Sequence, residues 1–188
     1  MSMRASDDEV QQLVQAVQSG TADPLGLADR AIALYPDDAR LHFLRGSLLA
    51  GMSRPIEAHA ALGRAVALAP EFTLARFQLG FFELTSGEAE RALATWEPLD
   101  VQLSDGDYLA HFVAGLRHLV VDRFADAIVS LEAGIAVNGE NPPLNHDMEL
   151  IIGQCRSLVG AAAPAPDDSD EASATSFLLN QLGRGSIH

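Results

Sequence analysis

The sequence contains few basic residues, and this limits the kinds of molecule that the protein can be expected to bind. It contains no Lys; its twelve basic residues are all Arg, and 26 Asp and Glu residues give a formal net charge of -14. Duplex nucleic acid is bound through cationic patches that release phosphate counterions, and anionic membranes attract polybasic segments. The composition therefore argues against nucleic acid or an anionic membrane surface as the main partner.

Cysteine and long apolar runs are also scarce. Cys155 is the single cysteine, so no intrachain disulfide can form, and a reducing compartment fits this composition. No run of about 18 apolar residues could cross a membrane. The opening residues MSMRASDDEV lack the apolar core of a signal peptide. We therefore expect a cytoplasmic protein with no membrane span, and the Arg-only, Ala-rich composition suggests a bacterial source.

Helix signals are abundant. Ser6 and Glu9 have the spacing of a capping box, and Gly20 ends the following apolar stripe, which predicts an N-terminal helix within residues 1–22. Farther along, helical stretches of roughly 12 to 16 residues alternate with short breakers. No stretch shows the two-residue alternation of a strand. The pattern predicts an all-α fold of antiparallel helix pairs.

An internal repeat organises these helices. Residues 39–70 align with 73–100 at an interval of 34 residues, and residues 108–135 form a third copy after one extra residue. The alignment superimposes small residues, a phenylalanine column and a large apolar column: Gly46, Gly80 and Gly115; Ala58, Ala92 and Ala127; Phe43, Phe77 and Phe112; Leu62, Trp96 and Leu131. The copies differ at one closing position, where the first has Ala65 and the third has Gly134.

These residues and their period resemble the tetratricopeptide repeat (TPR) family, whose unit is a 34-residue helix–turn–helix. The resemblance implies a right-handed α-solenoid of antiparallel helix pairs. It gives a half copy at 23–38 and full copies at 39–72, 73–107 and 108–141. Residues 142–160 then read as a C-terminal capping helix, which solenoids require at their ends.

In this family the first helices of successive repeats line a concave groove. The resemblance implies that the groove is lined by Arg40, Phe43, Ser47, Leu74, Phe77, Phe81, Leu84, Leu109, Phe112, Leu116 and Leu119. Spacings of three and four place the positions of each copy on one helix face. A large exposed apolar surface usually marks an interaction site, whereas the alternative is that these residues pack inside the repeats. Arg40 is the only cation among them, which argues against the carboxylate clamp of some family members.

The last residues form a separate feature. Residues 161–176 are acidic, contain Pro and predict a flexible linker, and residues 177–188 form an apolar tail motif. The tail offers a possible ligand for the groove through Phe177, Leu178, Leu179 and Leu182.

The sequence offers no catalytic constellation. His111 and His118 could share a helix side, but a metal site needs more convergent ligands. Cys155 lies on an apolar helical stripe, so we expect a buried structural thiol. The phosphate-binding Gly-rich loop and its Lys are lacking. We expect no enzyme activity, metal or cofactor.

The main functional hypothesis is a non-catalytic protein–protein interaction module. It would act as an adaptor, co-chaperone or assembly factor that binds an apolar peptide or helix in its groove. In one alternative the C-terminal tail occupies the protein's own groove or a neighbour's, which would allow a homo-oligomer. In another the protein is a secretion chaperone, because its size, acidity and repeat number resemble those of the TPR chaperones of bacterial type III secretion.

Overall fold

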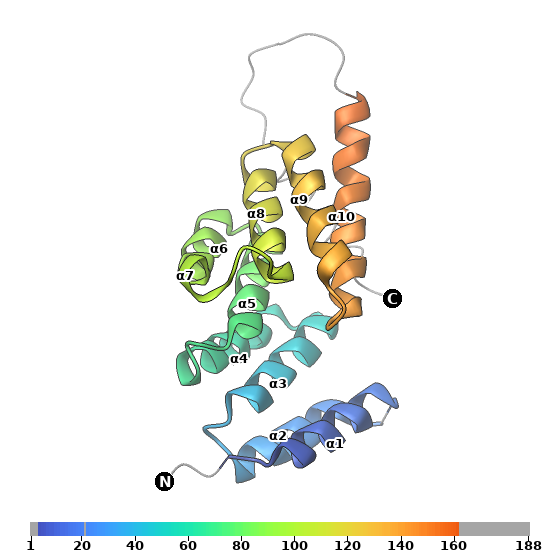
Figure 1. Cartoon of the computed structure of the whole chain (residues 1–188). Coiled ribbons are helices and arrows are strands. Elements are labelled where there is room, and N and C mark those ends of the chain that lie inside the picture. The colour runs from blue at the N-terminus through green and yellow to red at the C-terminus, as the bar shows by residue number, and fades with distance from the viewer. Residues whose placement is uncertain (1–3, 21, 162–188) are drawn as a thin grey trace. The chain divides into compact units, whose positions relative to one another are not determined.

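The computed structural model describes residues 4–20 and 22–161, and these residues are helical throughout apart from caps and short connections. Nine helices of eight residues or more and the one-turn α7 follow one another along this described part (Figure 1). The predicted all-α class is confirmed. The helices are α1 (Asp7–Gln18), α2 (Pro24–Leu34), α3 (Ala39–Gly51), α4 (Pro55–Leu68), α5 (Thr73–Thr85), α6 (Ala89–Trp96), α7 (Leu99–Gln102), α8 (Tyr108–Val120), α9 (Phe124–Val137) and α10 (Pro142–Ala161).

The described residues belong to two compact units, whose boundary lies within α5 between Phe82 and Glu83. Unit 1 contains α1 to α4 and most of α5, and unit 2 contains the end of α5 and α6 to α10. The tail motif and nearly all of the predicted linker lie outside the described residues. In the part of the chain that the structure describes, no helix is long and apolar enough to cross a membrane.

Unit 1 is built on the pair α3 and α4, with α2 packed against α3. The pair closes at Gly46, where an added Cβ would lie only 2.7 Å from Cγ of Leu62. A glycine is therefore required for the two helices to approach this closely. Leu49, Ala58 and Ala61 form a buried cluster beside this contact, and Leu25 and Phe82 pack against it.

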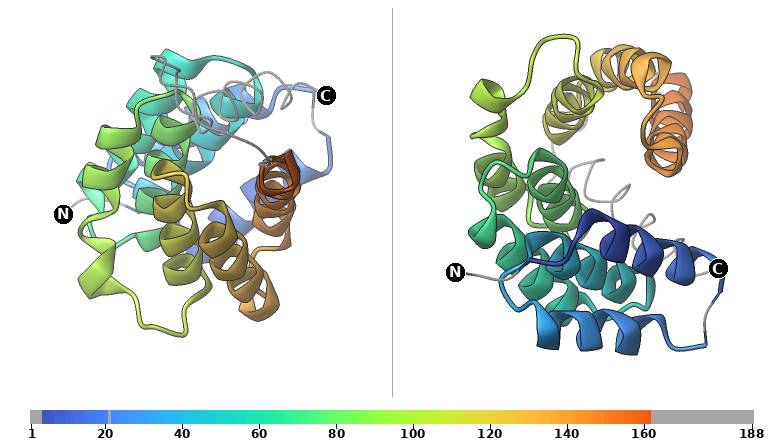
Figure 2. Two further views of the ribbon diagram at one scale, coloured as in Figure 1. Left: turned by 90° about the horizontal axis from the view of Figure 1, so that it is seen from above. Right: turned by 60° about the horizontal axis from the view of Figure 1, so that its bottom comes forward.

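Unit 2 repeats this construction. α8 packs on α9, and α9 also packs on α10, so that α9 lies between its two neighbours (Figures 1 and 2). An added Cβ at Gly115 would lie 2.7 Å from Cγ of Leu131, the same contact as in unit 1. α10 buries its apolar stripe of Leu144, Met148, Ile151, Ile152 and Cys155. The helices thus pack in consecutive pairs, consistent with a helical repeat.

The second copy departs from the other two. α4 and α9 each run for 14 residues, whereas α6 has 8 residues and the short α7 follows after Pro98. Proline has no N–H to donate to the carbonyl four residues earlier, and its ring clashes with that carbonyl. The second helix of this copy is therefore broken at Pro98, which the sequence analysis did not predict.

α1 begins with the predicted capping box. The Ser6 hydroxyl accepts a hydrogen bond from the Glu9 amide at 3.2 Å, and the Glu9 carboxylate accepts one from the Ser6 amide at 2.7 Å. Gly20 follows the helix with φ of +77°, a left-handed conformation that glycine adopts without a steric penalty. α1 buries none of its residues fully, and its contacts with α2 and α3 are few.

Candidate functional site

The groove positions predicted in unit 1 are mostly partly exposed. Arg40, Phe43 and Ser47 on α3, and Leu74 and Phe81 on α5, are all in this intermediate class. The ring centroids of Phe43 and Phe72 lie 5.2 Å apart, and those of the stacked rings of Phe77 and Phe81 lie 6.1 Å apart. Phe77 itself is fully buried. Unit 1 therefore retains some apolar and aromatic surface at these positions.

The groove positions predicted in unit 2 are buried without exception. Leu84, Leu109, Phe112, Leu116 and Leu119 are at most 3% exposed. The reason is clearest at Phe112, whose ring lies over Gly134. A Cβ added to Gly134 would lie only 2.4 Å from the nearest atoms of the Phe112 ring. The sequence left open whether these positions line a groove or pack inside the repeats. For these five residues and for Phe77, burial favours packing inside the repeats.

Arg40 is partly exposed, and its guanidinium binds the N-terminal segment. Its guanidinium donates to the Asp7 carboxylate at 2.6 Å and to the Ala5 carbonyl at 2.6 Å. It also donates to both oxygens of Asp38, at 3.0 and 2.7 Å. The Ala5 amide donates to Oδ2 of Asp38 at 3.1 Å. Both backbone groups of Ala5 are thus held by one Asp–Arg pair.

A second contact lies farther along the same segment. The Tyr35 hydroxyl, just after the end of α2, donates to Oε1 of Glu9 at 2.8 Å. We call the whole set the N-terminal clasp: Ala5, Asp7 and Glu9 on one side, and Tyr35, Asp38 and Arg40 on the other.

The charges of the clasp reinforce one another. Burial of Asp38 acts to raise the pKa of its carboxyl group, but hydrogen bonds from Arg40 outweigh this effect and the pKa is lowered. The hydrogen bond to Asp38 is the main cause of a raised Arg40 pKa. The backbone hydrogen bond from Ser6, followed by the one from Tyr35, lowers the pKa of Glu9. The carboxylates of Asp38 and Glu9 are therefore ionised at neutral pH.

Sequence reasoning identified Arg40 but not its partners. The contacts join residues 33 and 35 positions apart, and no periodic pattern connects them. The local signal was limited to Asp38, which caps α3 by accepting from the Arg40 amide at 3.1 Å. An N-cap carboxylate two residues before an arginine can hold that side chain in place, but the sequence does not say what else the arginine binds.

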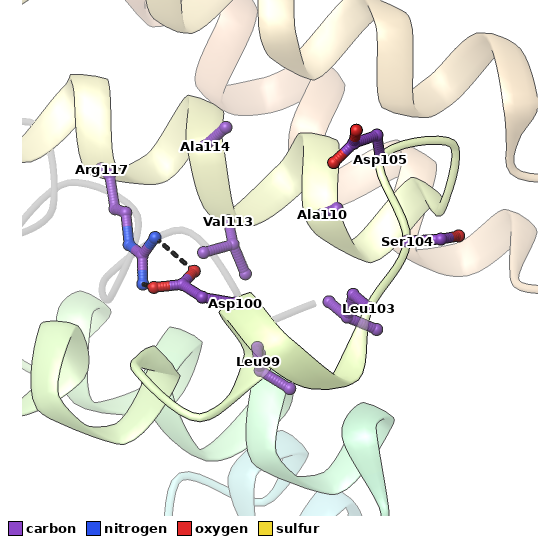
Figure 3. Close-up of a pocket in the computed structure, with 9 residues that line it drawn as sticks. All are labelled: Leu99, Asp100, Leu103, Ser104, Asp105, Ala110, Val113, Ala114 and Arg117. Carbon is purple, nitrogen blue, oxygen red and sulfur yellow. Dashed lines mark hydrogen bonds and ion pairs between the residues drawn. The ribbon is translucent and has the colours of Figure 1, made fainter.

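A shallow hollow lies in unit 2 where Pro98 interrupts the helix. Figure 3 shows α7, the following loop and α8 around it, with Arg117 and Asp100 pointing toward each other. Their two hydrogen bonds measure 2.7 and 3.2 Å. The volume, about 190 Å³, falls below the roughly 300–1,000 Å³ of typical small-molecule sites. The hollow is therefore small for a ligand site, and it is lined by Leu99, Asp100, Leu103, Ser104, Asp105, Ala110, Val113, Ala114 and Arg117.

Cys155 is buried, as expected for a structural thiol, and burial raises its pKa to about 11. The thiol is therefore protonated at neutral pH and weakly nucleophilic. Among the residues that the structure describes, no three His, Cys, Asp or Glu side chains are grouped so as to hold a metal ion.

No protein-family model matches the sequence. No curated protein is significantly similar to it either.

Proposed function

We propose that this chain is a non-catalytic protein–protein interaction module of the helical-repeat type. The observation that supports this most is the recurrence of one helix-pair contact, Gly46 against Leu62 and Gly115 against Leu131, in pairs that follow the repeat seen in the sequence. Stacked helix pairs offer extended surfaces for other proteins, with each pair supported by its neighbours.

The same recurrence, together with the 34-residue period, supports a TPR-type superhelix. In such a solenoid the first helices of the repeats would line the binding surface. The partly exposed positions of unit 1 are the part of that surface that can contact a ligand, because a fully buried side chain has no area left to bury against a partner. We therefore assign the proposed contact to Phe43 and Phe81, with an apolar protein segment as ligand.

The experiment is partner capture by the full chain from a lysate of its source organism, followed by mass spectrometry. The variant Phe43→Gln with Phe81→Gln should lose captured proteins, because it replaces two partly exposed rings with polar side chains. The matched control is Ile56→Gln, since Ile56 is 85% exposed on α4 and is not a predicted groove position. Equal capture by the wild type and the double variant would contradict the proposal.

The two alternative roles remain predictions. Docking of the tail motif through Phe177, Leu178, Leu179 and Leu182 concerns residues outside the described part of the chain. The secretion-chaperone role depends on the resemblance alone, and the same capture experiment tests it through the identity of the partner.

A further inference from the structure

We propose that residues 5–9 are a displaceable ligand in cis, seated on a peptide site formed by Tyr35, Asp38 and Arg40. We further propose that this site accepts in trans the acidic start of a partner helix with the same chemistry. The second part depends on the proposed function, because it names a protein segment as the partner. The first part does not.

The contacts at Ala5 are those of peptide recognition. Asp38 accepts from the Ala5 amide at 3.1 Å, and Arg40 donates to the Ala5 carbonyl at 2.6 Å, so the site binds both backbone groups of one residue. Ala5 is only 6% exposed. A larger side chain would need additional space there, so the site favours a small residue at this position.

The acidic residues that follow add selectivity. Two residues after Ala5, the Asp7 carboxylate binds Arg40 at 2.6 Å, and two residues later Glu9 binds the Tyr35 hydroxyl at 2.8 Å. Hydrogen bonds between charged groups are roughly twice as strong as neutral ones, and arginine is well suited to bind several acceptors at once. The recognised pattern is therefore a small residue, an N-cap residue such as Ser6, Asp, any residue and Glu, at the beginning of a helix.

The receptor side also has hydrogen bonds of its own. Two hydrogen bonds at 3.0 and 2.7 Å join Arg40 to Asp38, and Asp38 also caps α3. These interactions lie within residues 38–40 and do not involve the N-terminal segment. Removal of that segment would leave Asp38 and Arg40 paired, with the guanidinium and one carboxylate oxygen available to a new peptide.

The helix behind the ligand is weakly attached. α1 has no buried residue, and its apolar residues Val10, Leu13, Val14 and Val17 are only partly covered. Segments with little buried apolar area open at low free energy relative to the core. The polar contacts of residues 5–9 therefore carry a large share of the attachment, and a competing segment could release α1 without disturbing the pair α3 and α4.

The tether explains why a free peptide would bind the wild-type chain poorly. α1 is joined to α2 by a short connection, and short linkers give effective concentrations on the order of millimolar. The test must therefore weaken the cis ligand while leaving the receptor residues unchanged. The double variant Asp7→Asn with Glu9→Gln does this, because both residues lie on the ligand side of the clasp.

The experiment measures binding of a fluorescent, N-acetylated peptide with the sequence of residues 4–18 to the full chain by anisotropy. The Asp7→Asn, Glu9→Gln chain should bind it more tightly than the wild type, by a factor of up to ~10, since the tethered competitor loses two exposed contacts. Adding Arg40→Gln should abolish that gain. A control peptide carrying Asp7→Asn should bind weakly to every chain. Equal affinity of the wild-type and double-variant chains, or binding unaffected by Arg40→Gln, would overturn the proposal.

A second measurement covers the possibility that Arg40→Gln perturbs folding. In the Asp7→Asn, Glu9→Gln chain, hydrogen exchange should accelerate at α1 amides while α3 and α4 amides keep wild-type rates. Unchanged exchange at α1 would also overturn the proposal. If the peptide fails to bind while Phe43→Gln with Phe81→Gln still abolishes partner capture, this inference fails and the proposed function stands. If the peptide binds but no partner is captured, the proposed function fails and the cis ligand stands.

Discussion

The pair α3 and α4 in unit 1 and the pair α8 and α9 in unit 2 share one glycine–leucine contact but differ on the face beside it. Phe112 is fully buried in unit 2, whereas its counterpart Phe43 in unit 1 is partly exposed. The copies differ at the position that lies under the ring. Gly134 leaves room for Phe112, and Ala65 stands at the matching position of the first copy.

One methyl group can account for this difference. A Cβ at position 134 would lie 2.4 Å from the Phe112 ring, a distance at which the ring has to move. The first copy has Ala65 at the matching position, and there the Phe43 ring centroid lies 5.2 Å from that of Phe72. In unit 2, the absence of a side chain at Gly134 is thus a condition for the buried position of Phe112.

The largest expected effect comes from truncating the two phenylalanines. Phe112→Ala should destabilise unit 2 by about 3–5 kcal/mol, because it removes a buried ring and leaves a cavity. Phe43→Ala should cost about 1–2 kcal/mol, because a partly exposed ring has less transfer free energy to lose. Native-state hydrogen exchange at α8 and α3 amides measures each loss locally. Equal losses of stability for the two variants would show that Phe43 and Phe112 are buried to the same extent in solution.

A smaller effect is expected from filling the space under Phe112. Gly134→Ala should destabilise α8 and α9 by about 1–3 kcal/mol, since overpacking displaces the ring. The matched control is Gly153→Ala in α10, where nothing lies within 4 Å of an added Cβ. That variant should instead stabilise the helix by up to about 1 kcal/mol, the difference in helix propensity between the residues. Thermal and urea unfolding of both variants provide the measurement.

The helix pairs could be predicted from the sequence because they depend on local pattern. Gly46 and Leu62, like Gly115 and Leu131, lie only one helix apart in the chain. The capping box at Ser6 involves residues three positions apart. The buried Cys155 also follows from a local pattern, because it lies on an apolar stripe.

The burial of the groove positions could not be predicted in the same way. Phe43 and Phe112 share one alignment column and look equivalent, yet their burial depends on the residue facing them from another helix. The difference between Ala65 and Gly134 was visible in the sequence, but its consequence needs the distance between helices. The clasp around Arg40 depends on contacts more than thirty residues apart and has no periodic signal.

The clasp makes α1 sensitive to acid in a way that the helix pairs are not. The lowered pKa values of Asp38 and Glu9 mean that their ionised forms stabilise the folded state. This contribution is complete above the ordinary carboxyl values of about 4 and is lost as the pH falls through the lowered values. Amide resonances of α1 in a pH titration by NMR should therefore shift toward those of a released helix below about pH 4. Simultaneous loss of the α3, α4, α8 and α9 resonances would contradict a separate release.

The smallest effect is expected at Arg117 in unit 2. Arg117 binds Asp100 through two hydrogen bonds, but the Asp100 side chain is 53% exposed, whereas that of Asp38 is 2% exposed. Exposed ion pairs contribute about 0.2–1 kcal/mol, because water and salt screen them and both side chains lose entropy. Arg117→Gln should therefore lower the free energy of unfolding by less than about 1 kcal/mol. Arg40→Gln removes the partner of a buried carboxylate and should cost more. Urea unfolding of the two variants at low and high salt measures both losses of stability. A loss for Arg117→Gln equal to or greater than that for Arg40→Gln would show that burial of the carboxylate does not set the strength of these ion pairs.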